Sequence, residues 1–270
     1  MEQLQEKYKQ LKGLLKHYQR VLVAYSGGTD SSLLLAVAVK ELGDQVLAVT
    51  AISPTSTRQE IEDAERLARQ LGVRHEIIDS GEMEFKEFVQ NTPERCYHCK
   101  RCRFSELKEI ARGNSIPWVL DGSNVDDLKD FRPGMRAAKE LGIISPLMEA
   151  GLTKEEIRKL SWQLGLATWD KPSSPCLASR IPYGQEITDE KLRRVEAAEE
   201  MLRLQGFSPV RVRHFEKEAR LEIAKEQFAQ LSDRAGEIAG KLKDLGFKEV
   251  TLNLSGFASG SLNRLIGEDR

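Results

Sequence analysis

Residues 21–42, VLVAYSGGTDSSLLLAVAVKEL, are the stretch that decides the fold. The apolar run at 21–25 predicts a short strand, and the apolar segment at 33–42 predicts a helix. Glycines between them let backbone N–H groups converge on an anion, and the start of the helix adds its partial positive charge. Serine hydroxyls in the same turn can donate hydrogen bonds to phosphate oxygens. The candidate phosphate-binding residues are Ser26, Gly27, Gly28, Ser31 and Ser32.

Asp30 in the same turn indicates a metal ion. A carboxylate would be repelled by bare phosphate, so its presence predicts a bridging Mg²⁺. The lysine of a Walker A loop is absent, and so is the G-x-G-x-x-G spacing of dinucleotide-binding proteins. A plain strand–helix turn, capped by Asp30 or Ser31, is the alternative for a glycine pair taken alone.

Strands and helices alternate along the first part of the chain. This order predicts an α/β fold, in which helices cover both faces of a parallel sheet. The expected strands are 21–25, 45–53, 74–80 and 117–124, and the expected helices are 4–19, 33–42, 58–72 and 105–114.

The pattern changes after about residue 180, where a small α+β domain is expected. We place the boundary at Ile181-Pro182-Tyr183-Gly184, which gives one domain over 1–180 and a second over 181–270. The second domain is expected to bind substrate or to mediate oligomerisation. Its expected elements are a helix at 188–206, strands at 209–215 and 219–225, a helix at 228–246 and a strand at 248–256.

A second polar loop, DGSNVDD at 121–127, follows the strand expected at 117–124. In a parallel sheet it would lie at the same carboxyl edge as the glycine turn, where ligands bind. Asp126 and Asp127 could hold Mg²⁺ there, and Arg132 could neutralise phosphate charge. A simple Asn/Asp turn is the alternative for the loop alone. The candidate nucleotide-binding residues of this part of the chain are Gly122, Ser123, Asn124, Asp126 and Arg132.

Both loops resemble those of the PP-loop ATP pyrophosphatases, which have an adenine nucleotide alpha hydrolase-like domain. The string S-G-G-x-D-S resembles their signature, and residues 122–127 resemble their G-T-N-x-x-D loop. The resemblance implies that the protein cleaves ATP between the α and β phosphates. AMP would be attached to a carbonyl or carboxylate oxygen, which a nitrogen or sulfur nucleophile then replaces.

Cys176 is the candidate nucleophile. It lies in KPSSPCLASRIPYG at 171–184, where three prolines and a glycine argue against regular structure and favour a shaped loop. Arg180 is close enough in sequence to favour the thiolate. A structural cysteine would more often lie inside a strand or helix.

Three stretches together resemble the LarE family, the ATP-dependent sulfur transferases of nickel-pincer nucleotide biosynthesis. They are S-G-G-x-D-S, R-C-Y-x-C-K and K-P-S-x-x-C-L-A-S-R-I-P-x-G. The resemblance implies adenylylation of both carboxylates of pyridinium-3,5-biscarboxylate mononucleotide, followed by attack of the Cys176 thiolate. In sacrificial members the substrate keeps the sulfur and the cysteine becomes dehydroalanine. Other enzymes of the pathway, which matures lactate racemase, are then the implied partners.

Cys96, Cys99 and Cys102 form a C-x-x-C-x-x-C run, which we expect on a loop. Some proteins resembling this family carry a 4Fe-4S cluster on three cysteines, and Cys96, Cys99 and Cys176 are the candidate ligands here. Ser179 and Arg180 stand where one cluster cysteine is expected, so we favour the sacrificial mechanism. Zinc bound with His98 or Cys176, and thiols without a role, remain open.

Arg211 and Arg213 alternate on an expected strand and therefore share a face, while Glu222 lies on the partner strand. Two guanidinium groups suit a nucleotide phosphate, although an exposed polar face is the alternative. The family resemblance favours a substrate-phosphate site. Glu199 or Glu200 could be the base that takes the Cα proton of the thioester, and a solvated helix face is the alternative.

The composition of the chain limits the classes of function that remain. The net charge of −1 over 270 residues argues against general nucleic-acid binding, and no apolar stretch is long enough to span a membrane. We expect a cytoplasmic homo-oligomer that uses ATP, Mg²⁺ and a nucleotide substrate. A tRNA-thiolating enzyme, an amide-forming PP-loop enzyme and a non-enzymatic ATP sensor are the alternatives.

Overall fold

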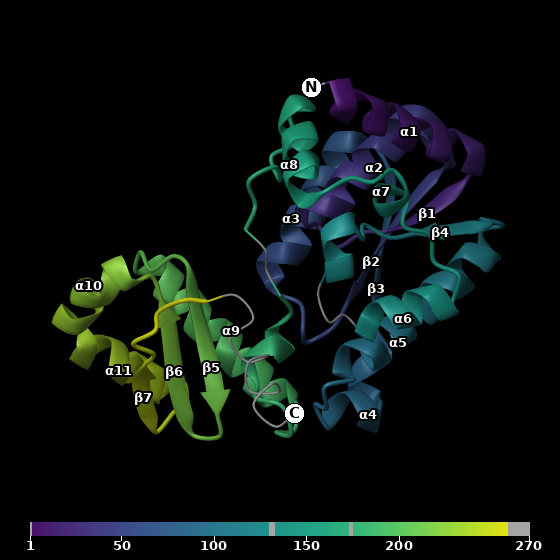
Figure 1. Cartoon of the computed structure of the whole chain (residues 1–270). Coiled ribbons are helices and arrows are strands. Elements are labelled where there is room, and N and C mark those ends of the chain that lie inside the picture. The colour runs from purple at the N-terminus through teal and green to yellow at the C-terminus, as the bar shows by residue number, and fades with distance from the viewer. Residues whose placement is uncertain (1, 130–132, 173–174, 259–270) are drawn as a thin grey trace. The chain divides into compact units, whose positions relative to one another are not determined.

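The computed structural model describes residues 2–129, 133–172 and 175–258. The chain folds as two compact units, and each is described by itself (Figure 1). The first unit contains Met1–Phe85 and Cys96–Ser174, and the second contains Lys86–Arg95 and Pro175–Arg270. The sequence-based boundary at residue 181 would have left Cys176 in the first unit, whereas the structure groups it with the second.

The first unit is built on a parallel sheet, as the alternation of strands and helices predicts. Its strands lie in the order β3-β2-β1-β4, and every neighbouring pair is parallel. Val21 is paired with Val46 on one side and with Trp118 on the other, so β1 is central. The strands are β1 (Val21–Ala24), β2 (Val46–Ile52), β3 (Arg74–Asp79) and β4 (Trp118–Leu120).

Helices cover both faces of this sheet because both faces are apolar. Val21 and Val23 contribute to a core with α1, α2, α3, α7 and α8, whereas Leu22 contributes to a second core with α5 and α6. The helices are α1 (Glu2–Tyr18), α2 (Thr29–Leu42), α3 (Arg58–Leu71), α5 (Arg95–Gly113), α6 (Pro133–Glu140), α7 (Pro146–Glu149) and α8 (Lys154–Gln163).

Helix α5 corrects one expectation, since the cysteine run lies on a helix and not on a loop. The sequence predicts a helix over 105–114, but α5 begins ten residues earlier, at Arg95. No glycine or proline lies between Arg95 and Arg112 to interrupt it. Phe104, Leu107 and Ala111 recur at helical spacing and bury one face against the sheet.

The second unit is a three-stranded sheet with helices on one face. β5 (Val210–Phe215) is antiparallel to β6 (Glu218–Ile223), which is parallel to β7 (Glu249–Leu252). The helix expected at 228–246 is two helices, because the backbone leaves helical geometry at Arg234. Its helices are α4 (Lys86–Val89), α9 (Asp189–Leu204), α10 (Phe228–Asp233) and α11 (Ala235–Asp244).

Asn91 ties residues 86–95 into this second unit. Its buried amide nitrogen donates to the carbonyl oxygens of Pro182, at 2.7 Å, and Gln185, at 3.0 Å. Its own carbonyl oxygen accepts from the Gly184 amide at 3.0 Å. These bonds join segments about 90 residues apart, which a sequence-based boundary cannot anticipate.

Candidate functional site

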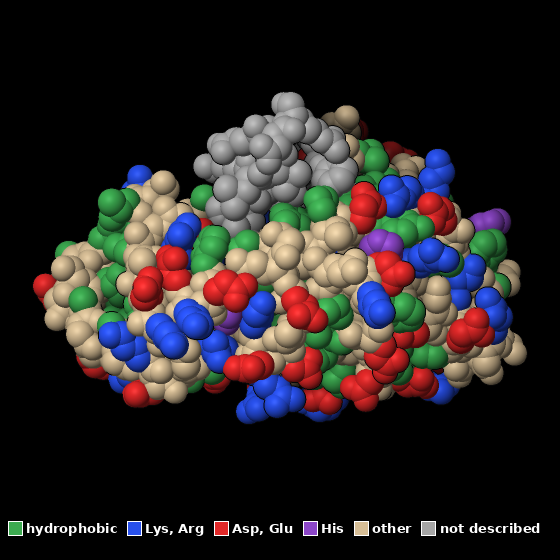
Figure 2. All heavy atoms as spheres, turned by 90° about the horizontal axis from the view of Figure 1, so that it is seen from below, with side chains coloured by type: hydrophobic (Ala, Val, Ile, Leu, Met, Phe, Trp, Pro, Cys, Tyr) green, Lys and Arg blue, Asp and Glu red, His purple; other side chains and the backbone are tan. Residues whose placement is uncertain are grey.

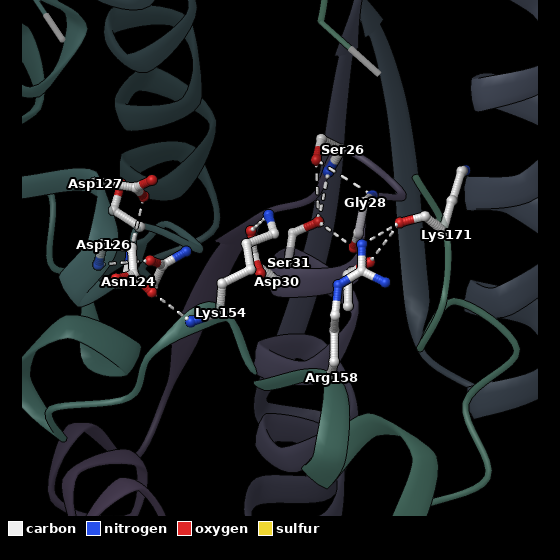
Figure 3. Close-up of polar contacts among 12 residues, drawn as sticks. Ser26, Gly28, Asp30, Ser31, Asn124, Asp126, Asp127, Lys154, Arg158 and Lys171 are labelled. Carbon is white, nitrogen blue, oxygen red and sulfur yellow. Dashed lines mark hydrogen bonds and ion pairs between the residues drawn. The ribbon is translucent and has the colours of Figure 1, made fainter. Parts of the chain in front are cut away.

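The glycine turn has the geometry of a phosphate cradle (Figure 3). Gly28 is the N-cap of α2, and Gly27 adopts a positive φ of 69°. A Cβ on Gly27 would lie 3.0 Å from the Cβ of Ala64, so both conformation and space require glycine there. Ser31 Oγ lies 3.0 Å from Ser26 Oγ and donates to the Gly28 carbonyl at 3.2 Å. The turn is therefore closed on itself with its serine hydroxyls gathered at the start of α2. Ser32 is fully buried at this helix start.

The second polar loop meets the glycine turn. A Cβ on Gly122 would lie only 2.8 Å from the Ser31 amide nitrogen, so glycine allows the two backbones to approach. Asn124 organises the loop, because its Oδ1 accepts from the Asp126 amide and its own amide donates to Asp127 Oδ2, each at 3.0 Å. Ser123 donates through its hydroxyl to Asp121 at 2.7 Å. Both loops thus lie at the carboxyl end of the sheet.

Lys154 links the two loops, and sequence reasoning missed it. Its Nζ lies 2.7 Å from Asp30 Oδ2, and its backbone amide donates to Asp126 Oδ2 at 2.8 Å (Figure 3). It is the first residue of α8, whose N-cap Thr153 forms a capping box with Glu156. The capping box therefore sets where this lysine lies relative to both aspartates.

Lys171 is a second missed cation beside the turn. Its Nζ donates to the Gly27 carbonyl at 3.1 Å and to Asp63 Oδ2 at 2.9 Å. Arg158 in turn donates to the Lys171 carbonyl at 2.9 Å. The signal for Lys171 was present, since it opens the K-P-S string that contributed to the family resemblance.

Asp30 and Asp126 suit a magnesium ion bound together with phosphate. Asp30 Oδ1 is buried and has no hydrogen-bond partner among the described residues. Mg²⁺ is commonly held by one or two carboxylates together with substrate phosphates and water. Within the described residues, no three His, Cys, Asp or Glu side chains form a complete metal site. Arg132, the remaining nucleotide-binding candidate, lies outside the described residues.

Cys176 is exposed at the start of a short 3-10 turn, Leu177–Arg180, in the second unit. Its carbonyl oxygen accepts from the Ser179 amide at 2.9 Å and from Arg180 Nη1 at 3.3 Å. The guanidinium of Arg180 is directed at Glu199, in a two-point ion pair of 2.8 and 2.9 Å. Arg180 thus holds the backbone of the loop, while its expected effect on the thiolate stays a prediction.

Glu199 is the buried partner of that loop and does not lie on a solvated face. Its side chain is fully buried and also accepts from Arg203, at 2.7 Å, and from the Val212 amide, at 3.1 Å. These four donated bonds occupy both carboxylate oxygens, so Glu199 anchors the loop. Glu199 or Glu200 as the base stays a prediction, and of the two Glu200 is the exposed residue.

Arg211 and Arg213 share the sheet face opposite the apolar core, as their spacing predicts. Arg213 is paired with Glu222 at 2.8 Å and donates to the Ser179 carbonyl at 2.7 Å, so it also fixes the Cys176 loop. Arg211 is only 4% exposed and has no hydrogen-bond partner among the described residues. Its guanidinium lies 4.7 Å from the ring centroid of Phe257.

The Arg211 guanidinium, which no described residue accepts a hydrogen bond from, suits an anion. Burial, together with the charges of Arg180 and Arg213, lowers the pKa of Arg211 to about 10, so it stays charged at neutral pH. The carboxylates of Glu199 and Glu222 act on Arg211 through their charge, but they are hydrogen-bonded to Arg180 and Arg213. A buried cation without a partner is costly, and an anionic ligand would remove that cost.

Comparison with known proteins identifies the family to which this chain belongs. A family model described as NAD synthase matches residues 4–115. Over 264 residues the chain is 39% identical to the pyridinium-3,5-bisthiocarboxylic acid mononucleotide synthase of Lactiplantibacillus plantarum, covering 97% of this chain and 96% of that protein. The chain belongs to the LarE family. It is therefore an enzyme with a PP-loop domain, a sulfur transferase of the LarE type, and the family resemblance is confirmed.

Two further relatives differ in how much of this chain their similarity covers. An uncharacterised protein of Synechocystis is 44% identical over 265 residues, covering 97% of this chain and 99% of that protein. The tRNA-specific 2-thiouridylase of Rickettsia africae is 30% identical over 191 residues, covering 57% of this chain and 52% of that protein. Similarity to LarE thus extends over nearly the whole chain, whereas similarity to the tRNA enzyme covers little more than half.

The cysteine helix of this LarE-family chain contains thiols of two kinds. Cys96 is exposed, and Cys99 and Cys102 are both partly exposed. Cys102 Sγ donates to Glu106 Oε1 at 3.3 Å, and burial together with this carboxylate raises the pKa of Cys102 to about 12. Cys102 is therefore protonated at neutral pH and bonded to a carboxylate of its own helix.

Beside Cys102 lies a partly buried ion pair that sequence reasoning also missed. Arg103 Nη2 lies 2.6 Å from Glu82 Oε1, and the same carboxylate oxygen accepts from Ser53 at 2.6 Å and from Thr55 at 3.3 Å. Ser53 and Thr55 directly follow β2. The pair therefore fastens α5 to the carboxyl end of the sheet, where the nucleotide loops lie.

Acidic and basic side chains are interspersed over the face drawn in Figure 2. Among the described helices, none is both long enough and apolar enough to cross a membrane.

Proposed function

We propose that this LarE-family enzyme adenylylates pyridinium-3,5-biscarboxylate mononucleotide and converts its carboxylates to thiocarboxylates, with Cys176 as the sulfur donor. The observation that carries the proposal is the loop of Cys176. The exposed thiol lies on a backbone that Arg180 and Arg213 hold, in the same unit as Arg211, whose guanidinium has no hydrogen-bond partner among the described residues. An exposed thiol and an anion site in one unit suit a substrate that brings both a carboxylate and a phosphate.

The first step would use the first unit. Backbone amides and hydroxyls of the glycine turn would bind the ATP phosphates, and Lys154 and Lys171 would supply positive charge beside them. Mg²⁺, held by Asp30 and Asp126, would neutralise the charge of the pyrophosphate leaving group. The substrate carboxylate would then attack the α-phosphate, pyrophosphate would leave, and an acyl-adenylate would form.

The second step would use the second unit. The Cys176 thiolate would attack the acyl carbon, AMP would leave with the bonding electron pair, and a thioester would form. Removal of the Cα proton of Cys176 would then break its Cβ–S bond. The substrate would keep sulfur as a thiocarboxylate, and residue 176 would become dehydroalanine. Glu200 is our proposed base for that proton.

Arg211 would bind the substrate phosphate. One charge-assisted hydrogen bond contributes about 1.5–3 kcal/mol, so Arg211→Ala should weaken substrate binding by roughly tenfold to hundredfold. Binding of ATP should be unchanged, because its phosphates use the glycine turn.

Pyrophosphate release tests the order of these steps. Cys176→Ala should still release pyrophosphate when ATP and the biscarboxylate nucleotide are present, because the thiol acts only after adenylylation. It should form no thiocarboxylate. If Cys176→Ala stops pyrophosphate release, or leaves thiocarboxylate formation intact, Cys176 is not the donor in the proposed sequence.

A 4Fe-4S cluster as sulfur carrier is the second candidate, and one feature of α5 favours it. Cys96 and Cys99 are three residues apart on a helix, so their side chains lie on the same face. Cysteine thiolates are the common ligands of such clusters, so the two thiols could contribute two of them. Anaerobic purification followed by iron and sulfide assays distinguishes this carrier from a sacrificial cysteine.

A further inference from the structure

The segment after β7 brings an aromatic ring to Arg211. The chain turns at Leu254 and Ser255, and the Phe257 amide donates to the Ile223 carbonyl at 2.8 Å, which fastens it to β6. Gly256 has a positive φ of 78°, a conformation that suits glycine. A Cβ there would also lie 2.9 Å from Lys225 Cγ. This backbone path places Phe257 over the guanidinium, 4.7 Å from its ring centroid.

The contact between Arg211 and the Phe257 ring differs from the contacts of the neighbouring arginines, which are made to carboxylates. Arg180 and Arg213 are held in position by the carboxylates of Glu199 and Glu222. Arg211 lies opposite Glu222 in the strand register, yet Glu222 is bonded to Arg213. Among the described residues, the ring of Phe257 packs on the Arg211 guanidinium, while Glu199 and Glu222 act on it through their charge.

A ring on the face of a guanidinium leaves the hydrogen-bond donors free, because those donors lie in the guanidinium plane. A carboxylate partner would occupy the same in-plane donors that a phosphate needs. An aromatic contact can therefore hold Arg211 in one orientation while keeping it available to a ligand.

We propose that Phe257 is the positioning residue of the anion site, and that it presents the in-plane donors of Arg211 to the substrate phosphate. The inference rests on the proposed function, in which Arg211 binds that phosphate. It extends the site to a segment beyond the last strand, where no motif drew attention to it.

Binding of nicotinic acid mononucleotide to the full chain tests the inference, with isothermal titration calorimetry as the measurement. This probe carries one pyridinium carboxylate and the phosphate. Phe257→Leu removes the ring and should weaken binding roughly 2- to 30-fold, the range expected for a cation–π contact. Phe257→Tyr keeps the ring and should restore the affinity to within about twofold.

A matched control lies on the same sheet. Arg220 is stacked on Phe215 with its guanidinium 4.1 Å from the ring centroid, but Arg220 is partly exposed and paired with Glu218. Phe215→Leu should therefore leave probe affinity unchanged. If Phe257→Leu does not fold, Phe257→Met takes its place, because it also keeps apolar volume without a ring.

The binding results distinguish the role of Arg211 from the role of Phe257. Arg211→Ala with unchanged probe affinity would overturn the phosphate assignment, and the role of Phe257 with it. A loss in Arg211→Ala together with wild-type affinity in Phe257→Leu would overturn only the role of Phe257. Equal losses in Phe257→Leu and Phe257→Tyr would show that the residue serves packing and does not orient Arg211.

Discussion

Buried charges determine how the loop of Cys176 is held. Taking an ion pair out of water costs several kcal/mol per ion, and good geometry must offset that cost. Glu199 meets this condition, because Arg180 and the Val212 backbone amide both donate hydrogen bonds to it. The side chains of Arg180 and Glu199 are both buried. The pair thus joins α9, β5 and the turn after Cys176 at one buried point.

Replacing Glu199 distinguishes a structural role of this residue from a role as the catalytic base. Glu199→Gln should lower the free energy of unfolding by about 3–5 kcal/mol, because it leaves Arg180 buried without a counter-charge. Urea denaturation measures this loss. Glu200→Gln is the matched control on the exposed side of the same helix and should change stability by at most about 0.5 kcal/mol. A Glu199→Gln protein of wild-type stability that forms the thioester but cannot release thiocarboxylate would make Glu199 the base.

The thiols should differ in reactivity as their environments differ. A raised pKa keeps a thiol protonated at higher pH, so Cys102, with a pKa of about 12, should be almost entirely protonated at pH 8. Exposed Cys176 should therefore be alkylated by iodoacetamide at pH 8 while Cys102 stays unmodified in the folded protein. Peptide mass mapping reads out both sites. Equal alkylation of Cys102 and Cys176 would contradict the burial of Cys102.

At the scale of elements, the start of α8 supplies a cation to the nucleotide loops. The capping box at Thr153 fixes the first turn of α8, and Lys154 contacts Asp30 and Asp126 from that turn. A lysine so placed can neutralise Asp30 until ATP and its metal ion bind, and can then face the phosphates.

Lys154→Ala should therefore slow pyrophosphate release by roughly tenfold to hundredfold, the loss expected for one charge-assisted hydrogen bond. A phosphate-release assay coupled to pyrophosphatase measures the rate. Lys159→Ala, an exposed lysine on the same helix, is the control and should behave as wild type. An unchanged rate in Lys154→Ala would exclude Lys154 from the adenylylation step.

Some helices, strands and site residues could be predicted from the sequence, and others could not. The strands, the glycine turn and the polar loop after β4 could be predicted because apolar runs and local motifs encode them. Lys154 could not, since it meets Asp30 across 124 residues and lies at an ordinary helix start. The helical cysteine run was missed because its spacing suggested a ligand loop, although its composition permits a helix.

For the whole molecule, the division into two units separates the two halves of the proposed chemistry. The glycine turn, Lys154 and Lys171 lie in the first unit, while Cys176 and its arginines lie in the second. The sequence-based division places Cys176 with the nucleotide loops because the boundary there follows composition. The structure instead follows the hydrogen bonds of Asn91, Arg180 and Arg213, which connect distant segments.

The central claim is that Cys176 gives up its sulfur, and the intact mass of the protein after a single round of reaction tests it most directly. With ATP, Mg²⁺ and the biscarboxylate nucleotide, the account predicts a loss of about 34 Da, the mass of H₂S, localised to residue 176. Two protein chains should be consumed per dithiolated product, and Cys96→Ala and Cys99→Ala should retain the transfer. Repeated turnover with added sulfide, with the mass at residue 176 unchanged, would contradict the account.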